Sequence, residues 1–423
     1  MSVRQAISVR GGKRLEGEIR VQGAKNSALP ILAAAVLCKT QVTLYNCPRL
    51  TDCDAAMRIL TTLGCSCRRE GNAVTINPSA ITTAAIPTNL MREMRSSVIF
   101  SGALLGREKQ CRLSFPGGCE IGARPIDFHI AAFRKMGVNV CEEHGCLICR
   151  ADKLCGAKIN LPLPSVGATE NIILAAVLAQ GVTEIHNAAR EPEITDLAGF
   201  LNRCGAKIKG AGTELITIEG VKELYGCEYT VMPDRIAAAT YLCCAAITRG
   251  ELVLTSSDYR SLQPVLCVLE QMGCSIYSFG GNSIYLNARK SLKAPPTIRT
   301  AVHPGFPTDA QPVLMALCSA VSGTSIFVET IFENRYRHVS ELSRLGARIS
   351  VEGRVAVVEG TDRLSGAELM ATDLRGGAAM VAAGLFAEGV TVVGNAAYIY
   401  RGYEDIESVL RSVGADIRAV AQS

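Results

Sequence analysis

The sequence predicts an α/β protein of two domains, each built from three copies of one repeated unit around buried helices. Three observations support this prediction. The chain has 423 residues, of which 48% are hydrophobic and 20% charged, which is the balance of a globular protein long enough for two or three domains. One glycine motif recurs six times, and six stretches rich in Ala and Leu recur with it.

The glycine motif marks the end of a helix and the start of a strand in every unit. In each copy a helical stretch ends in a hydrophobic residue and a glycine, and a second hydrophobic residue follows three positions later. Glycine readily adopts the left-handed conformation that ends many helices, so each copy predicts a helix C-terminus. Corresponding glycines in the two halves of the chain are 209 residues apart: Gly64 and Gly273, Gly137 and Gly346, Gly205 and Gly414.

Each unit is expected to begin with a strand and a buried helix. The six stretches rich in Ala and Leu are nearly apolar around their whole circumference, which is typical of helices buried on all sides. They span residues 23–37, 94–106, 165–181, 233–247, 306–321 and 374–389. Runs rich in β-branched residues, which predict strands, follow most of them, at 42–46, 182–187, 252–256 and 391–395. An amphipathic helix, the glycine and a strand pair complete the unit, in the order βαβαββ.

The polar residues at the starts of the buried helices differ from copy to copy. A repeat that served only as a scaffold would not require this variety, so we favour a functional cleft over a scaffold. If the helices within a domain run parallel, their N-termini converge, and the free N–H groups and helix dipoles favour an anionic ligand. The residues are Lys25 and Asn26, Arg95, Ser165, Val166 and Gly167, Asp234 and Arg235, Asp309, and Asp373 and Arg375.

The segment Pro116–Pro125 is a glycine-rich loop with one cysteine and one arginine. Cys119 lies in front of an expected helix start and five residues before Arg124, and both features favour the thiolate. The alternative is that Cys119 is one surface cysteine among 18. Arg124 lies 13 residues before Gly137, and Arg401 lies 13 residues before Gly414, so the two arginines occupy the same place in units of opposite halves. With Lys25 they could bind a small phosphate or carboxylate anion.

Composition and segment lengths exclude several classes of protein. A formal net charge of +5 with no Trp does not predict a nucleic-acid binder. No apolar run is long enough to span a membrane, and the first residues lack the apolar core of a signal peptide. The cysteines are therefore expected to be free thiols in the cytoplasm. Metal binding by Cys146 and Cys149 is the alternative, but no second CxxC follows at zinc-ribbon spacing.

Nine motifs, in order along essentially the whole chain, resemble the UDP-N-acetylglucosamine 1-carboxyvinyltransferases, which belong to the EPSP synthase family of enolpyruvyl transferases. The motifs are GAKNSALPILAAAVL, PGGCEIGARP, SVGAT, AAREPEI, PDRI, FPTD, FENR, ATDLR and RGYE. The resemblance implies two inside-out, barrel-like α/β domains, one of residues 22–231 and one of residues 1–21 with 232–423. It places the active site in the cleft between them.

The resemblance also implies a reaction and a set of residues. The enolpyruvyl group of phosphoenolpyruvate passes to the 3-hydroxyl of UDP-N-acetylglucosamine by addition and elimination, phosphate is released, and no metal or organic cofactor is needed. Asp309 then either accepts the proton of the sugar hydroxyl as general base or positions that hydroxyl. Cys119 is the general acid, the nucleophile for a covalent adduct and the site alkylated by fosfomycin. Lys25, Arg124 and Arg401 hold the phosphate and carboxylate. The expected substrate-binding residues are Lys25, Asn26, Arg95, Arg124, Ser165, Val166, Gly167, Asp309, Ile331, Arg335, Arg375 and Arg401.

The chain departs from the family pattern at two positions. Leu163 stands where many members have lysine, and Tyr400 stands where they often have aspartate. Two alternatives to the active enzyme remain: a catalytically silent paralogue that binds a nucleotide sugar, and 3-phosphoshikimate enolpyruvyl transferase, which lacks a cysteine on a PGGC loop. Glu191 and Glu193 either organise the cleft or form a solvated pair. The expected setting is the first committed step of peptidoglycan synthesis, in cell wall biogenesis, cell shape, cell cycle and cell division.

Overall fold

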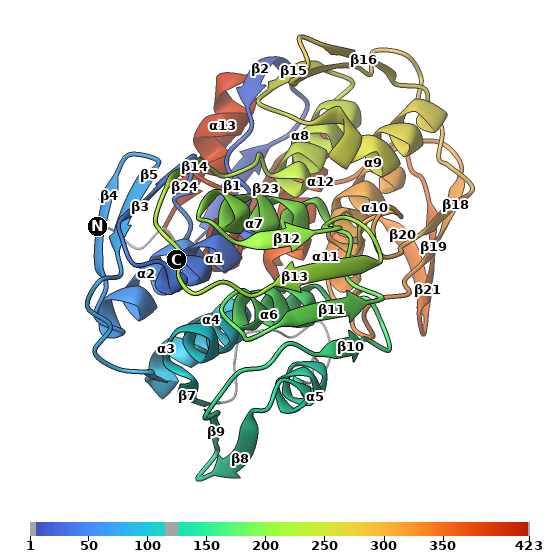
Figure 1. Cartoon of the computed structure of the whole chain (residues 1–423). Helices are drawn as coiled ribbons and strands as arrows, with labels where there is room; N and C mark the ends of the chain where they lie inside the picture. The colour runs from blue at the N-terminus through green and yellow to red at the C-terminus, as the bar shows by residue number, and fades with distance from the viewer. Residues whose placement is uncertain (1–5, 115–125, 422–423) are drawn as a thin grey trace. The chain divides into compact units, whose positions relative to one another are not determined.

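The computed structural model describes residues 6–114 and 126–421 (Figure 1). These residues form two compact units. The first unit consists of residues 23–114 and 126–232, and the second consists of residues 6–22 and 233–421. Each unit has its own hydrophobic core, so each is described separately.

The first unit contains three four-stranded sheets within the described residues. Their orders are β14–β3–β5–β4, β6–β7–β9–β8 and β10–β11–β13–β12. The strands are β3 (Val42–Tyr45), β4 (Ser66–Glu70), β5 (Ala73–Asn77), β6 (Ala85–Ile86), β7 (Gln110–Ser114), β8 (Asn139–Glu143), β9 (Cys146–Arg150), β10 (Lys158–Asn160), β11 (Val182–His186), β12 (Lys207–Lys209), β13 (Leu215–Glu219) and β14 (Glu228–Thr230).

The second unit also has three four-stranded sheets in the part of the chain that the structure describes. Their orders are β16–β17–β15–β2, β18–β19–β21–β20 and β22–β23–β1–β24. The strands are β1 (Ala6–Arg10), β2 (Glu16–Arg20), β15 (Glu251–Thr255), β16 (Ser275–Phe279), β17 (Ser283–Asn287), β18 (Thr297–Arg299), β19 (Thr324–Val328), β20 (Arg348–Glu352), β21 (Val355–Glu359), β22 (Glu368–Met370), β23 (Val390–Gly394) and β24 (Asp416–Val420).

All six sheets repeat one pairing pattern. Each contains one parallel pair and two antiparallel pairs, as in β10–β11 (parallel), β11–β13 and β12–β13 (both antiparallel). In four of the six sheets a helix links the two strands of the parallel pair, because parallel neighbours need a crossover. The parallel pairs β3–β14 and β2–β15 instead join strands that are distant in the sequence. The repeat predicted from the glycine spacing is therefore a repeat of sheets and helices, and the predicted α/β class is confirmed.

The two N-terminal strands pair with strands that are distant in the sequence. β1 lies between β23 and β24 and is antiparallel to both, and β2 is parallel to β15. Although β2 precedes the first buried helix along the chain, β14 provides the parallel partner of β3, the strand after that helix. The chain therefore passes between the two units at residues 22–23 and again at 232–233.

Each unit encloses three helices that are buried almost completely. In the first unit these are α1 (Lys25–Ala34), α4 (Phe100–Glu108) and α6 (Val166–Ala176). In the second unit they are α8 (Arg235–Ile247), α10 (Gln311–Ser319) and α12 (Leu374–Phe386). Single turns of 3₁₀ helix adjoin them: η1 (Ala35–Leu37), η2 (Arg95–Ile99) and η3 (Thr308–Ala310). The predicted buried helices are confirmed, and at residues 95 and 308 they begin with a tighter 3₁₀ turn.

The outer helices are amphipathic and end at the repeated glycines. They are α2 (Thr51–Thr62), α5 (Asp127–Lys135), α7 (Pro192–Arg203), α9 (Tyr259–Met272), α11 (Val339–Arg344) and α13 (Ile406–Ser412). All six glycines have φ between 91° and 107°, so the left-handed helix ends predicted from the motif are confirmed. The remaining helical elements are α3 (Thr88–Glu93) and η4 (Ala396–Arg401). Among the described residues no helix is long and apolar enough to cross a membrane.

Candidate functional site

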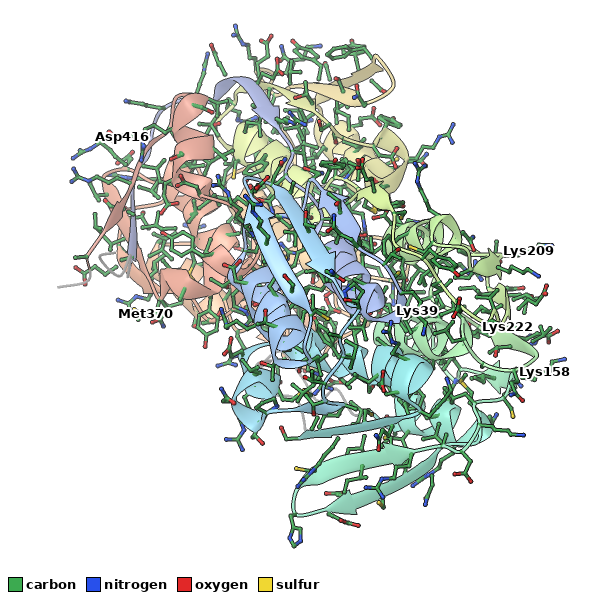
Figure 2. All side chains as sticks on the ribbon, turned by 60° about the vertical axis from the view of Figure 1, so that its left-hand side comes forward. Lys39, Lys158, Lys209, Lys222, Met370 and Asp416 are labelled. Atoms are coloured by element: carbon green, nitrogen blue, oxygen red, sulfur yellow. The ribbon has the colours of Figure 1, made fainter. Side chains whose placement is uncertain are left out.

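Lys25 and Asp52 form a buried ion pair in the first unit. Lys25 is the first residue of α1, and its Nζ lies 2.6 Å from the Oδ2 of Asp52 in the first turn of α2. The two side chains are only 9% and 4% exposed. A lysine is seldom buried to this degree, and here a carboxylate compensates its charge. In Figure 2 the lysines Lys158, Lys209 and Lys222 instead project outward from the same unit.

The start of α1 is also fixed by its neighbour Asp196. Ser27 Oγ donates to Asp196 Oδ2, and the same carboxylate accepts hydrogen bonds from the Tyr229 hydroxyl and from the Met232 backbone N–H. Burial raises the pKa of Asp196, although these hydrogen bonds oppose the shift. Asn26, between Lys25 and Ser27, is exposed. The first turn of α1 is therefore rigid and presents one polar side chain outward.

The predicted substrate-binding residues at the start of α6 lie beside a buried histidine. Ser165 caps α6 by accepting a hydrogen bond from Ala168 N, and a Cβ on Gly167 would lie 3.4 Å from the His129 ring. Asn171 Nδ2 lies 2.7 Å from His129 Nδ1. Because an amide N–H can only donate, Nδ1 accepts and the ring proton is on Nε2.

His129 stays neutral because of its surroundings. Burial, together with the nearby positive charge of Arg95, lowers the pKa of His129 to about 4. Arg95, Gly167 and the ring of His129 are thus neighbours in space, although they come from η2, α6 and α5. Arg95 and the Ser165–Gly167 segment, both predicted from the sequence, are brought together here, and His129 is an addition that no sequence pattern marked.

A carboxylate between two buried arginines is the central feature of the second unit. Asp309 lies in η3, and its side chain is 28% exposed. Its Oδ1 lies 3.4 Å from Arg335 Nη2, and its Oδ2 lies 3.3 and 3.2 Å from Nε and Nη2 of Arg375. The arginine side chains are only 1% and 3% exposed. Two guanidinium groups at this distance favour the ionised carboxylate, which can accept a proton.

Both arginines are held by further contacts. Arg335 donates to the backbone oxygen of Thr308 from Nε and Nη2, and its Nη1 lies 3.6 Å from Asp373 Oδ1. Burial opposes the charge on Arg375, but Tyr403 and Asp309 outweigh it and raise the pKa of this guanidinium. Arg375 therefore remains charged, and both arginines are fixed in orientation.

Glu329 organises the backbone around Ile331. This carboxylate is 1% exposed and accepts hydrogen bonds from the backbone N–H groups of Ile331 and Phe332, at 2.8 and 3.1 Å. Its other oxygen accepts from the Thr308 hydroxyl at 3.0 Å. Ile331 is thus tied to the turn that contains Asp309. The sequence analysis missed Glu329, since a glutamate at the end of a β-strand carries no distinctive pattern.

Tyr400 makes a contact that an aspartate at this position could not make. Its hydroxyl donates to Oε1 of Glu407, which is 1% exposed and lies in the first turn of α13. The departure from the family pattern thus places a tyrosine where its long side chain reaches a buried carboxylate. Arg401 follows as the last residue of η4 and is half-buried. The second departure, Leu163, is 65% exposed.

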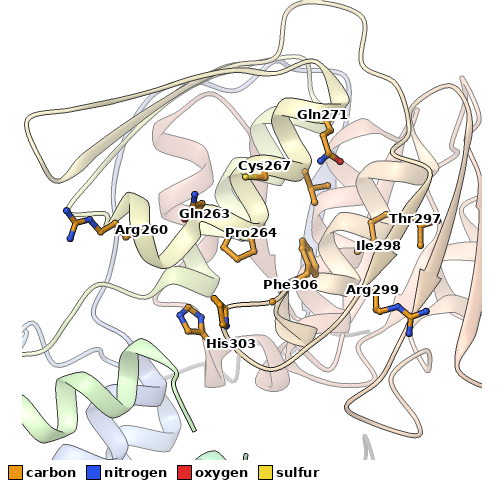
Figure 3. A pocket seen from close by; sticks show the side chains of 13 residues that line it. Arg260, Gln263, Pro264, Cys267, Gln271, Thr297, Ile298, Arg299, His303 and Phe306 are labelled. Atoms are coloured by element: carbon orange, nitrogen blue, oxygen red, sulfur yellow. The ribbon is translucent and has the colours of Figure 1, made fainter. Parts of the chain in front are cut away.

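A groove of about 630 Å³ lies beside the segment that leads to Asp309 (Figure 3). It is bounded by α9 and by the chain from β18 to Phe306, and none of its lining residues is acidic. Arg260 and Arg299 contribute positive charge at its rim, and Phe306 and Pro264 contribute apolar surface. The sequence did not predict this groove, because its two sides, Arg260–Gln271 and Thr297–Phe306, are separate segments of the chain and carry no motif.

Two predicted catalytic residues, Cys119 and Arg124, lie outside the described residues. The described residues contain no group of three or more potential metal ligands. Cys146 and Cys149 are three positions apart on strand β9, so their side chains point to opposite faces of the sheet. This geometry does not suit the metal site that their spacing left open.

A family model described as EPSP synthase (3-phosphoshikimate 1-carboxyvinyltransferase) matches residues 9–410. The chain is 52% identical over 411 residues to UDP-N-acetylglucosamine 1-carboxyvinyltransferase 2 of Caldanaerobacter subterraneus subsp. tengcongensis, and the match covers 97% of this chain and 98% of the relative. It is 48% identical to UDP-N-acetylglucosamine 1-carboxyvinyltransferase of Solidesulfovibrio magneticus, with 97% and 98% covered.

Among solved structures, the enolpyruvyl transferase NikO of Streptomyces tendae is similar, with a TM-score of 0.88, 27% identity and 98% of both chains covered. By sequence and by fold, the chain belongs to the EPSP synthase family and, within it, to the UDP-N-acetylglucosamine 1-carboxyvinyltransferases.

Proposed function

We propose that this chain transfers the enolpyruvyl group of phosphoenolpyruvate to the 3-hydroxyl of UDP-N-acetylglucosamine and releases phosphate. One observation carries the choice of reaction: 52% identity, over 97% of the chain, to a relative named for this activity. The alternative acceptor, 3-phosphoshikimate, is disfavoured because the curated relatives at 46–52% identity are named for the nucleotide sugar. A silent paralogue is disfavoured because Asp309 keeps a partly exposed carboxylate between two arginines.

In the proposed reaction Asp309 accepts the proton of the sugar hydroxyl. The hydroxyl oxygen bonds to C2 of phosphoenolpyruvate while C3 takes a proton from Cys119, which gives a tetrahedral intermediate. The Cys119 thiolate then takes a proton back from C3 while phosphate departs with the proton held by Asp309, which restores the double bond and leaves the enolpyruvyl ether. Ionisation of Asp309, favoured by Arg335 and Arg375, supports the role of general base.

The remaining predicted residues are proposed to bind the two substrates. Lys25, Arg124 and Arg401 are proposed to bind the phosphate and carboxylate of phosphoenolpyruvate and to stabilise charge in the intermediate. Asn26 and Arg95, Ser165–Gly167, Ile331, Arg335 and Arg375 are proposed to contact the nucleotide sugar or to position groups that do. The location of the site in a cleft between the two predicted domains remains a prediction, as do a cytoplasmic location and roles in cell wall growth and cell division.

The direct test measures phosphate release from phosphoenolpyruvate by the full chain. We expect release that depends on UDP-N-acetylglucosamine, that 3-phosphoshikimate does not support, and that prior treatment with fosfomycin abolishes by labelling Cys119. Release with 3-phosphoshikimate instead would refute the assignment of the acceptor. Tight binding of the nucleotide sugar without any release would indicate a silent paralogue.

The role of Asp309 is tested by a conservative substitution. Asp309→Asn keeps the size of the side chain but removes the base, and we expect kcat to fall by at least about a hundredfold. Asp362→Asn, at an exposed position of the same unit, is the matched control and is expected to keep wild-type activity. Equal activity of the two variants would exclude Asp309 as the general base.

A further inference from the structure

Arg375 connects the candidate base to a buried tyrosine. Its Nε and Nη2 face Asp309 Oδ2, and its Nη1 lies 3.2 Å from the hydroxyl of Tyr403. The guanidinium carbon also lies 5.5 Å from the centroid of the Tyr403 ring, within the range of a cation–π contact. All three nitrogen atoms of Arg375 are therefore engaged, one pair by the carboxylate and one atom by the tyrosine.

The hydroxyl of Tyr403 is itself held in place. Tyr403 is 1% exposed, and its oxygen lies 2.8 Å from Thr240 Oγ1 on α8. Thr240 Oγ1 in turn donates to the backbone oxygen of Ile236 at 2.9 Å. Burial raises the pKa of Tyr403, so the hydroxyl keeps its proton.

These contacts define the direction of each hydrogen bond. Arginine can only donate, so Tyr403 accepts from Arg375. Because the single proton of Thr240 goes to Ile236, the Thr240 oxygen accepts the proton of Tyr403. The result is a directed chain from Arg375 through Tyr403 and Thr240 to a backbone carbonyl. Such a chain has one arrangement, and it leaves the Arg375 guanidinium little freedom to rotate.

The two oxygens of Asp309 are held by different arginines. Arg335, which is fixed by Thr308 O, faces Oδ1, and Arg375 faces Oδ2. If Arg375 could rotate, the carboxylate would keep its contact at Oδ1 but could turn about it. A general base must present its oxygen within hydrogen-bond distance of the proton that it accepts.

We propose that Tyr403, together with Thr240, is a positioning residue for the reaction: it fixes Arg375 and thereby the orientation of the Asp309 carboxylate. This inference rests on the proposed function, in which Asp309 is the base. Tyr403 directly follows Arg401 and Gly402 in the RGYE motif, but nothing in the sequence connects it with Thr240, 163 residues earlier.

The variant Tyr403→Phe removes one oxygen and keeps the ring. We expect kcat to fall about tenfold to hundredfold while KM for both substrates changes less than about threefold, because the loss affects orientation of the base more than binding. The acidic limb of the pH profile of kcat should move to higher pH, since a loosely held Arg375 favours the ionised carboxylate less.

Matched variants separate positioning from general packing. Thr240→Val removes the acceptor for the Tyr403 proton and should reproduce the effect in part, whereas Thr240→Ser keeps the hydroxyl and should restore wild-type behaviour. Tyr336→Phe is the control, because Tyr336 is a buried tyrosine of the same unit whose hydroxyl bonds to the backbone, at Phe327 O, at Arg354 O and at Glu329. It should lose stability without a shift of the pH profile.

A second readout does not depend on activity. In protein labelled with ¹⁵N-arginine, the Nε–H signal of Arg375, identified by its loss in Arg375→Lys, should indicate restricted rotation in the wild type and faster rotation in Tyr403→Phe. An unchanged NMR signal, or an active Tyr403→Phe with the kcat and pH profile of the wild type, would overturn the inference. A wild-type protein without phosphate release would instead contradict the proposed function, while the NMR comparison would still decide whether Tyr403 restrains Arg375.

Discussion

The buried ion pair between Lys25 and Asp52 predicts that Lys25 both stabilises the first unit and binds substrate, and that mutation can separate these two roles. Nζ and Oδ2 are 2.6 Å apart, and the side chains are 9% and 4% exposed. Removing one member of a buried pair leaves an uncompensated charge and typically costs about 3–5 kcal/mol, whereas removing both is often nearly neutral. Lys25→Met should therefore lower the free energy of unfolding of the first unit by about 3–5 kcal/mol.

The double variant Lys25→Met/Asp52→Asn should recover most of that loss, because no buried charge is left. It should not recover activity, since Lys25 is proposed to bind the anionic substrate. The assay is urea unfolding followed by circular dichroism, together with phosphate release, for the wild type, both single variants and the double variant. Equal stability of the double variant and Lys25→Met would refute the reasoning, as would recovery of activity.

The control is the surface pair of Lys207 and Glu219 in the same unit. Their charged atoms are 2.5 Å apart, but their side chains are 56% and 57% exposed. Water screens such a pair, so Lys207→Met should change the free energy of unfolding little. A loss equal to that of Lys25→Met would mean that burial does not determine the cost.

Three further predictions concern other parts of the chain. Burial lowers the pKa of His129 and of His338 from 6.5 to about 4. The stability that depends on each neutral histidine is therefore complete above pH 6.5 and is lost as the pH falls towards 4. Each protonation should lower the free energy of unfolding by up to about 3 kcal/mol, which urea unfolding at pH 7 and pH 4.5 would detect. Gly273→Ala should cost about 1–2 kcal/mol because φ is 107° there, and a thermal or urea midpoint unchanged from wild type would contradict this. Cys119→Ser should abolish phosphate release or trap the intermediate, whereas Cys146→Ser should be as active as wild type.

Local features of the sequence were sufficient to predict the six repeated units. The glycine after each outer helix requires a left-handed backbone, and a helix that is apolar on all sides must be buried, so both predictions depend on residues within one or two turns of each other. The starts of the buried helices marked Asp309 and Arg375, and the resemblance added Arg335. The fold brings both arginines within 3.4 Å of the Asp309 carboxylate.

The partners of these residues could not be predicted in the same way. Asp52 follows Lys25 by 27 residues, and Thr240 precedes Tyr403 by 163, so no spacing rule connects them. Glu329 directly follows an ordinary strand, and His129 lies in an ordinary helix. Each acquires its role only because the fold brings it to a polar group that would otherwise be buried without compensation.

The sequence by itself determined the six units, the ends of their helices and the family to which the chain belongs, because each of these depends on short patterns that repeat along the chain. Only the tertiary structure decided which carboxylate faces which arginine, that Lys25 is neutralised by Asp52, and that Tyr403 and Thr240 restrain Arg375. The reason is physical: a buried charge must find compensation wherever the packed chain provides it, and that place is set by the whole fold rather than by neighbours in sequence.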